Sequence, residues 1–354
     1  MPAEPMTDRL RVGVIGLRFG SQVHIPAFRS DPRCDVIALA GRDARKAADI
    51  ARALDVPSSY ADWRELVAAP DVDAVGIAVP PAAQPAIIAE AVRQQKHVFC
   101  EKPLAATVDE ARLALLAADA AGVVHGIDFI FPEIAVWQQA KASLADGAIG
   151  RPVHFAYTWR TETYASRTNS PSWKNRPAEG GGVLGNFVSH VAYNIEWLLG
   201  RILGFEGLVQ PRDRRQGRAF DGVVRLENGV TGSLSISTDA FLGSGHLVEI
   251  YGDEGTLVLH NSASDYVTGF RLSIGTRASG ALECVLTHPD AGAAVDGRLE
   301  PVSALVRRFI DAIHGGRAMT PTLADGVRVQ ELLALADAAE PGPRFAESPS
   351  HTIR

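Results

Sequence analysis

The feature that most constrains this chain is the alternation of short apolar strands with helical segments over residues 1–128. Strands and helices that alternate in this way form a doubly wound parallel sheet. Ligands of such sheets bind at the carboxyl ends of the strands, so the side chains that directly follow each strand are the first candidates for function. The expected strands lie at 10–15, 34–40, 72–79, 98–100 and 123–128.

A glycine turn follows the first expected strand, with the sequence Gly16-Leu17-Arg18-Phe19-Gly20-Ser21. A strand, a glycine turn and a helix are the context of the dinucleotide fingerprint Gly-x-Gly-x-x-Gly/Ala. Gly16 matches its first position, while Arg18 and Ser21 occupy the second and third. Arginine at the second position is a departure; Gly20 can restore some backbone freedom, and Arg18 can turn outward to a phosphate. The alternative is a plain strand-to-helix turn.

The second expected strand ends at Gly41-Arg42, close to the distance from Gly16 at which the ribose-reading residue stands. An acidic residue there accepts from the 2′-hydroxyl of NAD, whereas a guanidinium favours the 2′-phosphate of NADP. We therefore expect NADP as the cofactor, with NAD as the second choice. The alternative is that Arg42 only begins a solvated helix.

Glu101-Lys102-Pro103 directly follows the apolar strand 98–100. Two charges and a proline cannot continue a buried strand, so Lys102 is expected at the mouth of the crevice. The alternative is a solvated lysine in a strand-to-helix turn.

From about residue 130 the pattern changes to closely spaced strands, and Asn228-Gly229 marks a tight hairpin between two of them. Such a run predicts a mostly antiparallel sheet. The expected fold is α/β for residues 1–128, followed by an α+β domain over residues 129–354 with a large open sheet. Its expected strands lie at 152–159, 205–210, 219–227, 230–238, 246–251, 256–260, 268–274 and 281–287, and two helices are expected at 302–314 and 324–338.

A glycine tract, Gly180-Gly181-Gly182, leads into a helical pattern that carries Asn186 and His190. Glycines allow the backbone to approach a ligand or another segment closely. Residues four apart share one face of a helix, so the two polar side chains are expected side by side. A lone histidine can equally be a core residue, and because no third ligand accompanies His190, we expect no metal.

Composition excludes several classes of protein. The 354 residues carry a formal net charge of −6 and no basic stretch, which argues against a nucleic-acid partner. The three cysteines, Cys34, Cys100 and Cys284, are scattered, so neither disulfides nor a cysteine metal site is expected. No signal peptide or transmembrane run is evident, and a cytoplasmic protein without a membrane partner is expected.

These motifs resemble the Gfo/Idh/MocA family of glucose-fructose oxidoreductase and inositol dehydrogenase. The resemblance rests on Gly-Val-Ile-Gly at 13–16, Glu101-Lys102-Pro103, the glycine tract with His190, and the segment 251–257, Tyr-Gly-Asp-Glu-Gly-Thr-Leu. It implies a Rossmann domain, a substrate domain on an open sheet, and a homodimer or homotetramer formed through that sheet. It also implies hydride exchange between NAD(P) and a hydroxyl-bearing carbon of a sugar, cyclitol or related compound.

The resemblance assigns proton chemistry to Lys102, Asn186 and His190, although many members have Asp where this chain has Asn186. The expected cofactor-binding residues are Gly16, Arg18, Phe19, Gly20, Ser21, Gly41, Arg42, Val79, Pro80, Pro81, Gln84, Glu101 and Lys102. The candidates for a carbohydrate pocket are Arg160, Trp173, Lys174 and Arg176. Alternatives are reduction of a non-sugar such as an imine or bile pigment, and a catalytically silent NAD(P)-binding regulator, which the departures at Arg18 and Asn186 favour.

Overall fold

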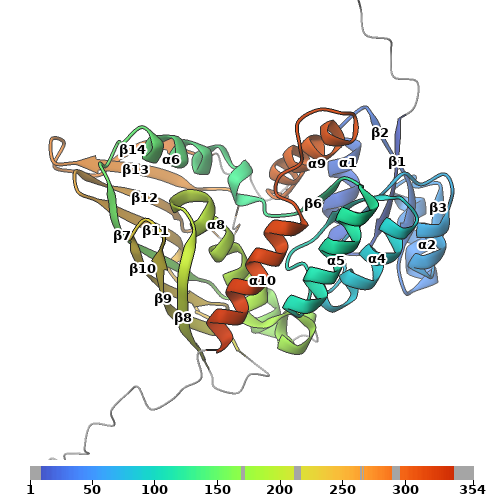
Figure 1. The fold of residues 1–354 in the computed structure, drawn as a ribbon, viewed down its shortest axis with the longest axis horizontal. Helices are drawn as coiled ribbons and strands as arrows, with labels where there is room; N and C mark the ends of the chain where they lie inside the picture. The colour runs from blue at the N-terminus through green and yellow to red at the C-terminus, as the bar shows by residue number, and fades with distance from the viewer. Residues whose placement is uncertain are drawn as a thin grey trace, which may run out of the picture.

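The protein folds around two β-sheets that lie at opposite ends of the molecule, with helices between and around them (Figure 1). The computed structural model describes residues 9–168, 172–210, 217–263, 265, 267–288 and 296–338.

The first sheet has six parallel strands in the order β3-β2-β1-β4-β5-β6. The chain reverses its direction of winding between β1 and β4, which is where a doubly wound sheet opens a crevice. This confirms the predicted α/β topology. The strands are β1 (Leu10–Ile15), β2 (Cys34–Ala40), β3 (Ser58–Tyr60), β4 (Ala74–Ile77), β5 (His97–Cys100) and β6 (His125–Ile127).

Helices connect these strands, and α2, α3 and α5 begin at polar caps. Asp43 and Asp62 accept hydrogen bonds at the starts of α2 and α3, and Thr107 forms a capping box with Glu110 at the start of α5. The connecting helices are the π-helical turn η1 (Gly20–His24), α1 (Ile25–Arg29), α2 (Ala44–Ala53), α3 (Trp63–Ala68), the 3₁₀ turn η2 (Pro81–Ala83), α4 (Gln84–Arg93) and α5 (Val108–Ala121).

The second sheet has eight strands in the order β14-β13-β12-β11-β7-β10-β9-β8. Only the β7–β10 pair is parallel, so the predicted mostly antiparallel sheet is confirmed. Asn228-Gly229 turns between β9 and β10, with Gly229 at a φ of 87°. The strands are β7 (Pro152–Arg160), β8 (Ile202–Gln210), β9 (Ala219–Leu226), β10 (Thr231–Ser237), β11 (Gly245–Gly252), β12 (Gly255–Asn261), β13 (Arg271–Thr276) and β14 (Glu283–Thr287).

The two faces of the second sheet differ in character. On β7, Phe155, Tyr157 and Trp159 are buried on the face covered by α6 and α8, whereas His154 and Arg160 point to the other face and are exposed. This alternation follows from the two-residue period of a strand. Within the described residues, no helix packs on the second face, which we call the outer sheet face.

The last two helices return to the first sheet. Helix α9 packs against α1 and β5, and α10 packs between α5 and α8. A division of the chain near residue 128 therefore stays a prediction, since the C-terminal helices contact both sheets. The remaining elements are the 3₁₀ turns η3 (Phe131–Glu133), η4 (Trp173–Asn175) and η5 (Pro177–Glu179), the π-helical turn η6 (Leu184–Val188), and α6 (Ala135–Ala145), α7 (Tyr164–Thr168), α8 (Ser189–Leu199), α9 (Leu299–Ile313) and α10 (Leu323–Ala338).

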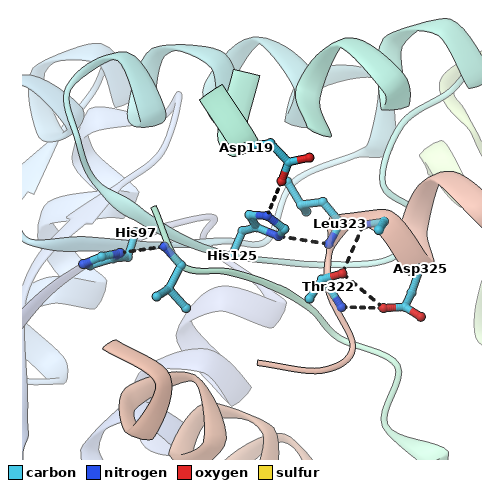
Figure 2. A network of polar contacts seen from close by, with 8 residues as sticks. His97, Asp119, His125, Thr322, Leu323 and Asp325 are labelled. Atoms are coloured by element: carbon cyan, nitrogen blue, oxygen red, sulfur yellow. Dashed lines mark hydrogen bonds and ion pairs between the residues drawn. The ribbon is translucent and has the colours of Figure 1, made fainter. Parts of the chain in front are cut away.

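Figure 2 shows how the start of α10 is tied to strand β6. The ring of His125 bridges the Asp119 carboxylate at 3.2 Å and the backbone nitrogen of Leu323 at 3.3 Å. The carboxylate of Asp325 accepts from the backbone nitrogen and the hydroxyl of Thr322. These bonds fix α10 against the first sheet. In the described part of the chain, none of the helices has both the length and the apolar character needed to cross a bilayer.

Candidate functional site

The glycine turn after β1 is closely packed and needs glycine at two positions. Gly16 has a φ of 135°, and a Cβ there would lie 2.2 Å from the backbone oxygen of Ala78. Gly20 packs against Val14, where a Cβ would lie 3.0 Å from Cγ1. The turn therefore brings β1, β4 and the following helix together at the reversal of the sheet, as the fingerprint predicts.

The side chains of the turn divide between inward and outward positions. The Ser21 hydroxyl donates to the backbone oxygens of Leu17 and Arg18, so it closes the turn from inside. Arg18 is exposed, and the Phe19 ring lies 4.9 Å from the guanidinium of Arg298. Arg18 thus has the outward orientation expected of a phosphate contact.

The end of β2 adjoins this turn. A Cβ on Gly41 would lie 2.3 Å from the Leu17 side chain, so Gly41 allows the two loops to meet. Arg42 beside it is exposed. The neighbouring carboxylate, Asp43, accepts from the backbone nitrogen of Lys46 at 3.0 Å and caps α2. The residue predicted to read the ribose, Arg42, is therefore an exposed cation, and the next acid along the chain is already hydrogen-bonded.

The loop after β4 supports the Glu-Lys-Pro turn. Val79 and Pro80 are partly buried beside the glycine turn, and Pro81 is buried. The Gln84 amide donates to the backbone oxygens of Glu101 and Pro103 at 2.9 and 2.7 Å. Gln84 is fully buried, so its observed contacts shape the turn that presents Lys102 and are not with the crevice.

Lys102 stands at the carboxyl end of β5, as the sequence predicts. Its Nζ donates to the backbone oxygen of Asn186 at 3.1 Å. Burial lowers the pKa of Lys102 to about 8, the Glu101 carboxylate opposes this shift, and the nearby Lys174 adds to it. A lysine with such a pKa can exchange a proton near neutral pH.

His190 is the second residue of α8 and is 5% exposed. Its ring packs edge-on to Phe131 at 5.1 Å and near Phe129 and Trp159. Burial lowers the pKa of His190 well below its usual value, and the Lys102 charge adds to the shift. His190 is thus a neutral imidazole near physiological pH, because the aromatic enclosure removes the water that would solvate an imidazolium.

Asn186 lies in the π-helical turn η6 before α8. Its backbone oxygen holds Lys102, while the Nδ1 of His190 is buried without a hydrogen-bond partner. The Asn186 side chain therefore makes no hydrogen bond to that ring nitrogen.

The glycine tract serves close packing between the two halves of the molecule. A Cβ on Gly180 would lie 2.7 Å from Pro81, and one on Gly181 would lie 2.0 Å from the backbone oxygen of Trp173. These glycines bring the turn η4 against the tract, and η4 carries Trp173 and Lys174. The tract thereby sets the position of two predicted substrate residues.

The four predicted substrate residues do not all meet at the site. Lys174 acts electrostatically on both Lys102 and His190, while burial and the charge of Arg298 lower its own pKa. Trp173 is partly buried, and Arg176 pairs with Glu179.

Arg160 is a correction to the expected pocket. It donates to the Ser235 hydroxyl on the outer sheet face, away from His190. Strand parity is the reason, because the neighbouring Trp159 faces the core and a one-residue step reverses direction.

Two carboxyl groups and a histidine lie beneath Lys102. His24 Nε2 lies 3.2 Å from Glu101 Oε1 and 3.9 Å from Asp128 Oδ2. Glu101 therefore turns its carboxylate toward these groups, although its side chain keeps 14% exposure. Of these three residues, only Glu101 lies in a motif that the sequence makes evident, and His24 and Asp128 were not predicted. Asp128 directly follows β6 as Glu101 directly follows β5, so its position at the end of a strand could have indicated it. Arg298, whose charge acts on Asp128, comes from the far end of the chain, and no strand-end pattern indicates it.

The arrangement suits a dinucleotide at the carboxyl edge of the first sheet. The outward Arg18, the close-packed Gly16 and the cation at position 42 fit a bound NAD(P). Lys102 and His190 lie where this edge meets the second sheet. A site with a hydride carrier on one side and a proton-exchanging lysine on the other can oxidise an alcohol or reduce a ketone.

Comparisons with known proteins agree with this geometry. Residues 10–129 match the oxidoreductase family with an NAD-binding Rossmann fold, GFO_IDH_MocA, and residues 137–258 match the GFO/IDH/MocA C-terminal domain. An uncharacterised oxidoreductase of Synechocystis is 32% identical over 93% of both chains. Levoglucosan dehydrogenase of Pseudarthrobacter phenanthrenivorans is 27% identical over 91% of this chain and 94% of that protein.

The same architecture occurs among solved structures. A levoglucosan dehydrogenase in complex with NADH and levoglucosan superposes with a TM-score of 0.82 at 25% identity, covering 94% of this chain and 97% of that one. The whole two-sheet arrangement, and not the first sheet alone, is therefore shared.

Proposed function

The chain belongs to the Gfo/Idh/MocA family of oxidoreductases with an NAD-binding Rossmann fold, and from that premise we propose that it transfers a hydride between nicotinamide and a hydroxyl-bearing carbon, or the corresponding ketone, of a sugar, cyclitol or related compound. The observation that carries the proposal is the convergence of Lys102 and His190 between the two sheets. Relatives named levoglucosan dehydrogenase, 1,5-anhydro-D-fructose reductase and inositol 2-dehydrogenase support a carbohydrate-like substrate.

Lys102 is the group we assign to proton exchange. When bound, the nicotinamide supplies the hydride acceptor or donor. In oxidation, neutral Lys102 takes the hydroxyl proton as the carbon loses its hydride; in reduction, the ammonium returns a proton to the oxygen. The His190 ring, neutral near physiological pH, hydrogen-bonds the same oxygen and fixes its position.

NADP is the cofactor we propose in preference to NAD. Its support is the exposed Arg42 next to the glycine turn, together with the engagement of Asp43 in capping α2. A guanidinium can bind a 2′-phosphate through two parallel hydrogen bonds, which a 2′-hydroxyl does not offer. The other cofactor contacts assigned to the exposed Arg18 and to Phe19, Val79 and Pro80 belong to the same proposal.

A homodimer or homotetramer through the outer sheet face is also part of the proposal. That face carries exposed apolar side chains, among them Val223 on β9 and Tyr251 on β11. Such a face on a long sheet is more stable when a second copy covers it.

The experiment is a fluorescence titration with NADPH and NADH, followed by a panel of sugars and cyclitols with the tighter cofactor. Tight NADPH binding and turnover of a carbohydrate support the proposal. Tight NADH binding would change the assigned cofactor to NAD and leave the proposed reaction unchanged. Binding without turnover of any panel member would favour the silent regulator, for which the Arg18 and Asn186 departures are the observations.

A further inference from the structure

Three titratable side chains form a buried cluster beside Lys102, and one of them is the glutamate of the Glu-Lys-Pro turn. His24 ends η1, Glu101 follows β5, and Asp128 follows β6. Their facing nitrogen and oxygen atoms lie within 4.8 Å of one another, and the side chains are 0%, 14% and 1% exposed. Three separate elements thus deliver ionisable groups to one point beside Lys102.

The two carboxyl groups have unequal environments. Asp128 Oδ1 is buried without a hydrogen-bond partner, which is costly for a carboxylate oxygen and far less so for a protonated acid. Burial and the adjacent Glu101 charge raise the pKa of Asp128 well above its usual value. For Glu101, burial acts in the raising direction, but the hydrogen bond with His24, the adjacent Asp128 carboxyl group and the charges of His24 and Lys102 outweigh it and leave its pKa lowered.

We propose that His24 and Asp128 are positioning residues for Lys102, with Asp128 holding a proton that it donates to Glu101, so that the cluster presents one negative charge beside the Lys102 ammonium. His24 donates from Nε2 to the same carboxylate, since its Nδ1 faces Gly76 and has no polar partner. This inference rests on the proposed function, in which Lys102 exchanges the proton.

The other charges around Lys102 make this single negative charge consequential. The positive charge of Lys174, in η4, lowers the pKa of Lys102. The positive charge of Arg298, which precedes α9, acts in the lowering direction on the pKa of Asp128. His190 lies close by but is neutral near physiological pH. The positive charge of Arg18 acts on Lys174 and lowers the pKa of that lysine. Burial and the nearby cations lower the pKa of Lys102, and the Glu101 carboxylate is then the main group that opposes this shift. A second ionised carboxylate would raise the pKa of Lys102 further, so that the ammonium would hold its proton too firmly.

The protonation of Asp128 can be tested without turnover, by infrared spectroscopy of the purified protein at pH 7. We expect a protonated-carboxyl C=O band that Asp128→Asn removes. The matched control is Glu133→Gln, because Glu133 is a buried carboxylate paired with Arg308 and its replacement should leave the band. A spectrum in which Asp128→Asn removes no such band would overturn the proposal.

The effect on Lys102 can be measured from the pH dependence of its acetylation by acetic anhydride, read by mass spectrometry with the exposed Lys46 as internal reference. Glu101→Gln should move the Lys102 midpoint down by about one pH unit, because it removes the opposing charge. Asp128→Asn should leave the midpoint in place, since an amide N–H also donates to Glu101. The reverse pattern, or no shift in either variant, would contradict the proposal.

The role of His24 is tested by comparing His24→Asn with His24→Phe in the same acetylation assay. Only the first retains a donor near Glu101, so only the second should lower the Lys102 midpoint. If His24→Phe does not fold, the infrared result and the Glu101 and Asp128 pair still decide the proposal.

Two outcomes separate this inference from its alternatives. The three residues are also chemically able to hold a divalent cation. A stoichiometric metal found by elemental analysis, whose removal by chelator changes the infrared and acetylation results, would overturn the shared proton. If the infrared and acetylation results are as expected but no dehydrogenase activity is found, the proposed function is refuted. The protonation assigned to the three-residue cluster then still stands.

Discussion

The Nζ of Lys102 lies 3.1 Å from the backbone oxygen of Asn186, and this bond joins the end of β5 to the turn that begins α8. It connects the edge of the parallel sheet to the helix that carries His190. Because the acceptor is a backbone atom, the amide side chain of Asn186 is not needed to make the contact. The geometry of Lys102 therefore depends on the path of the chain through the glycine tract.

The first prediction concerns the pH dependence of turnover. With a Lys102 pKa of about 8, the amine form grows as pH rises through that value. Alcohol oxidation should therefore increase with pH around a midpoint near 8, and ketone reduction should decrease over the same range. Lys102→Met should lower kcat by about a hundredfold or more and remove the midpoint, while NADPH binding persists. An unchanged pH profile in Lys102→Met would assign the proton step elsewhere.

The second prediction concerns Asn186. Asn186→Asp places a carboxylate beside Lys102, so the Lys102 pKa should rise and the oxidation profile should move up by about one pH unit. Asn186→Ala is the control, since it keeps the backbone oxygen that Lys102 contacts and should leave the midpoint in place. A profile that stays fixed in Asn186→Asp would show that the two positions are not coupled.

The third prediction addresses cofactor choice. Arg42→Ala should weaken NADPH binding by about tenfold or more through loss of charge-assisted hydrogen bonds, with little change for NADH. Arg52→Ala, at the far end of α2, removes a similarly exposed arginine and should change neither. Equal weakening of both cofactors in Arg42→Ala would argue against a 2′-phosphate contact.

The fourth prediction concerns the glycine tract. Gly181→Ala forces a Cβ toward the Trp173 oxygen, so we expect a loss of about 1–3 kcal/mol in unfolding free energy and a higher KM for the sugar, with cofactor affinity retained. Gly204→Ala is the control, because the nearest atoms to its Cβ lie at 3.8 Å or more. Thermal melts and steady-state kinetics measure both effects, and equal melting temperatures in the two variants would contradict the packing argument.

The fifth prediction concerns assembly. Light scattering should find a dimer or tetramer. Val223→Glu, on the outer sheet face, should shift the distribution of oligomers toward smaller species. Leu113→Glu changes an exposed leucine on α5 and should have no such effect. A monomeric parent protein would contradict assembly through that face.

Much of the site could be predicted because it lies at strand ends. The Glu-Lys-Pro turn and the glycine turn each follow an apolar strand, and the topology of a parallel sheet places both at one edge. Asp128 follows the same rule and could have been predicted in the same way. The position of Arg160 required the exact register of β7, since one residue decides which face of a sheet a side chain occupies.

The sequence by itself determined most of the alternation of strands and helices, although not the short strand β3, and it determined the strand-end placement of Lys102, because these depend on local periodicity and on charges that a buried strand cannot contain. Only the tertiary structure decided the ionisation of His190, Glu101 and Asp128. Their pKa values depend on burial and on neighbours from distant parts of the chain, which no local pattern records. The meeting of His24, Glu101 and Asp128 is set by the packing of three elements around Lys102, and so it became visible only in the folded chain.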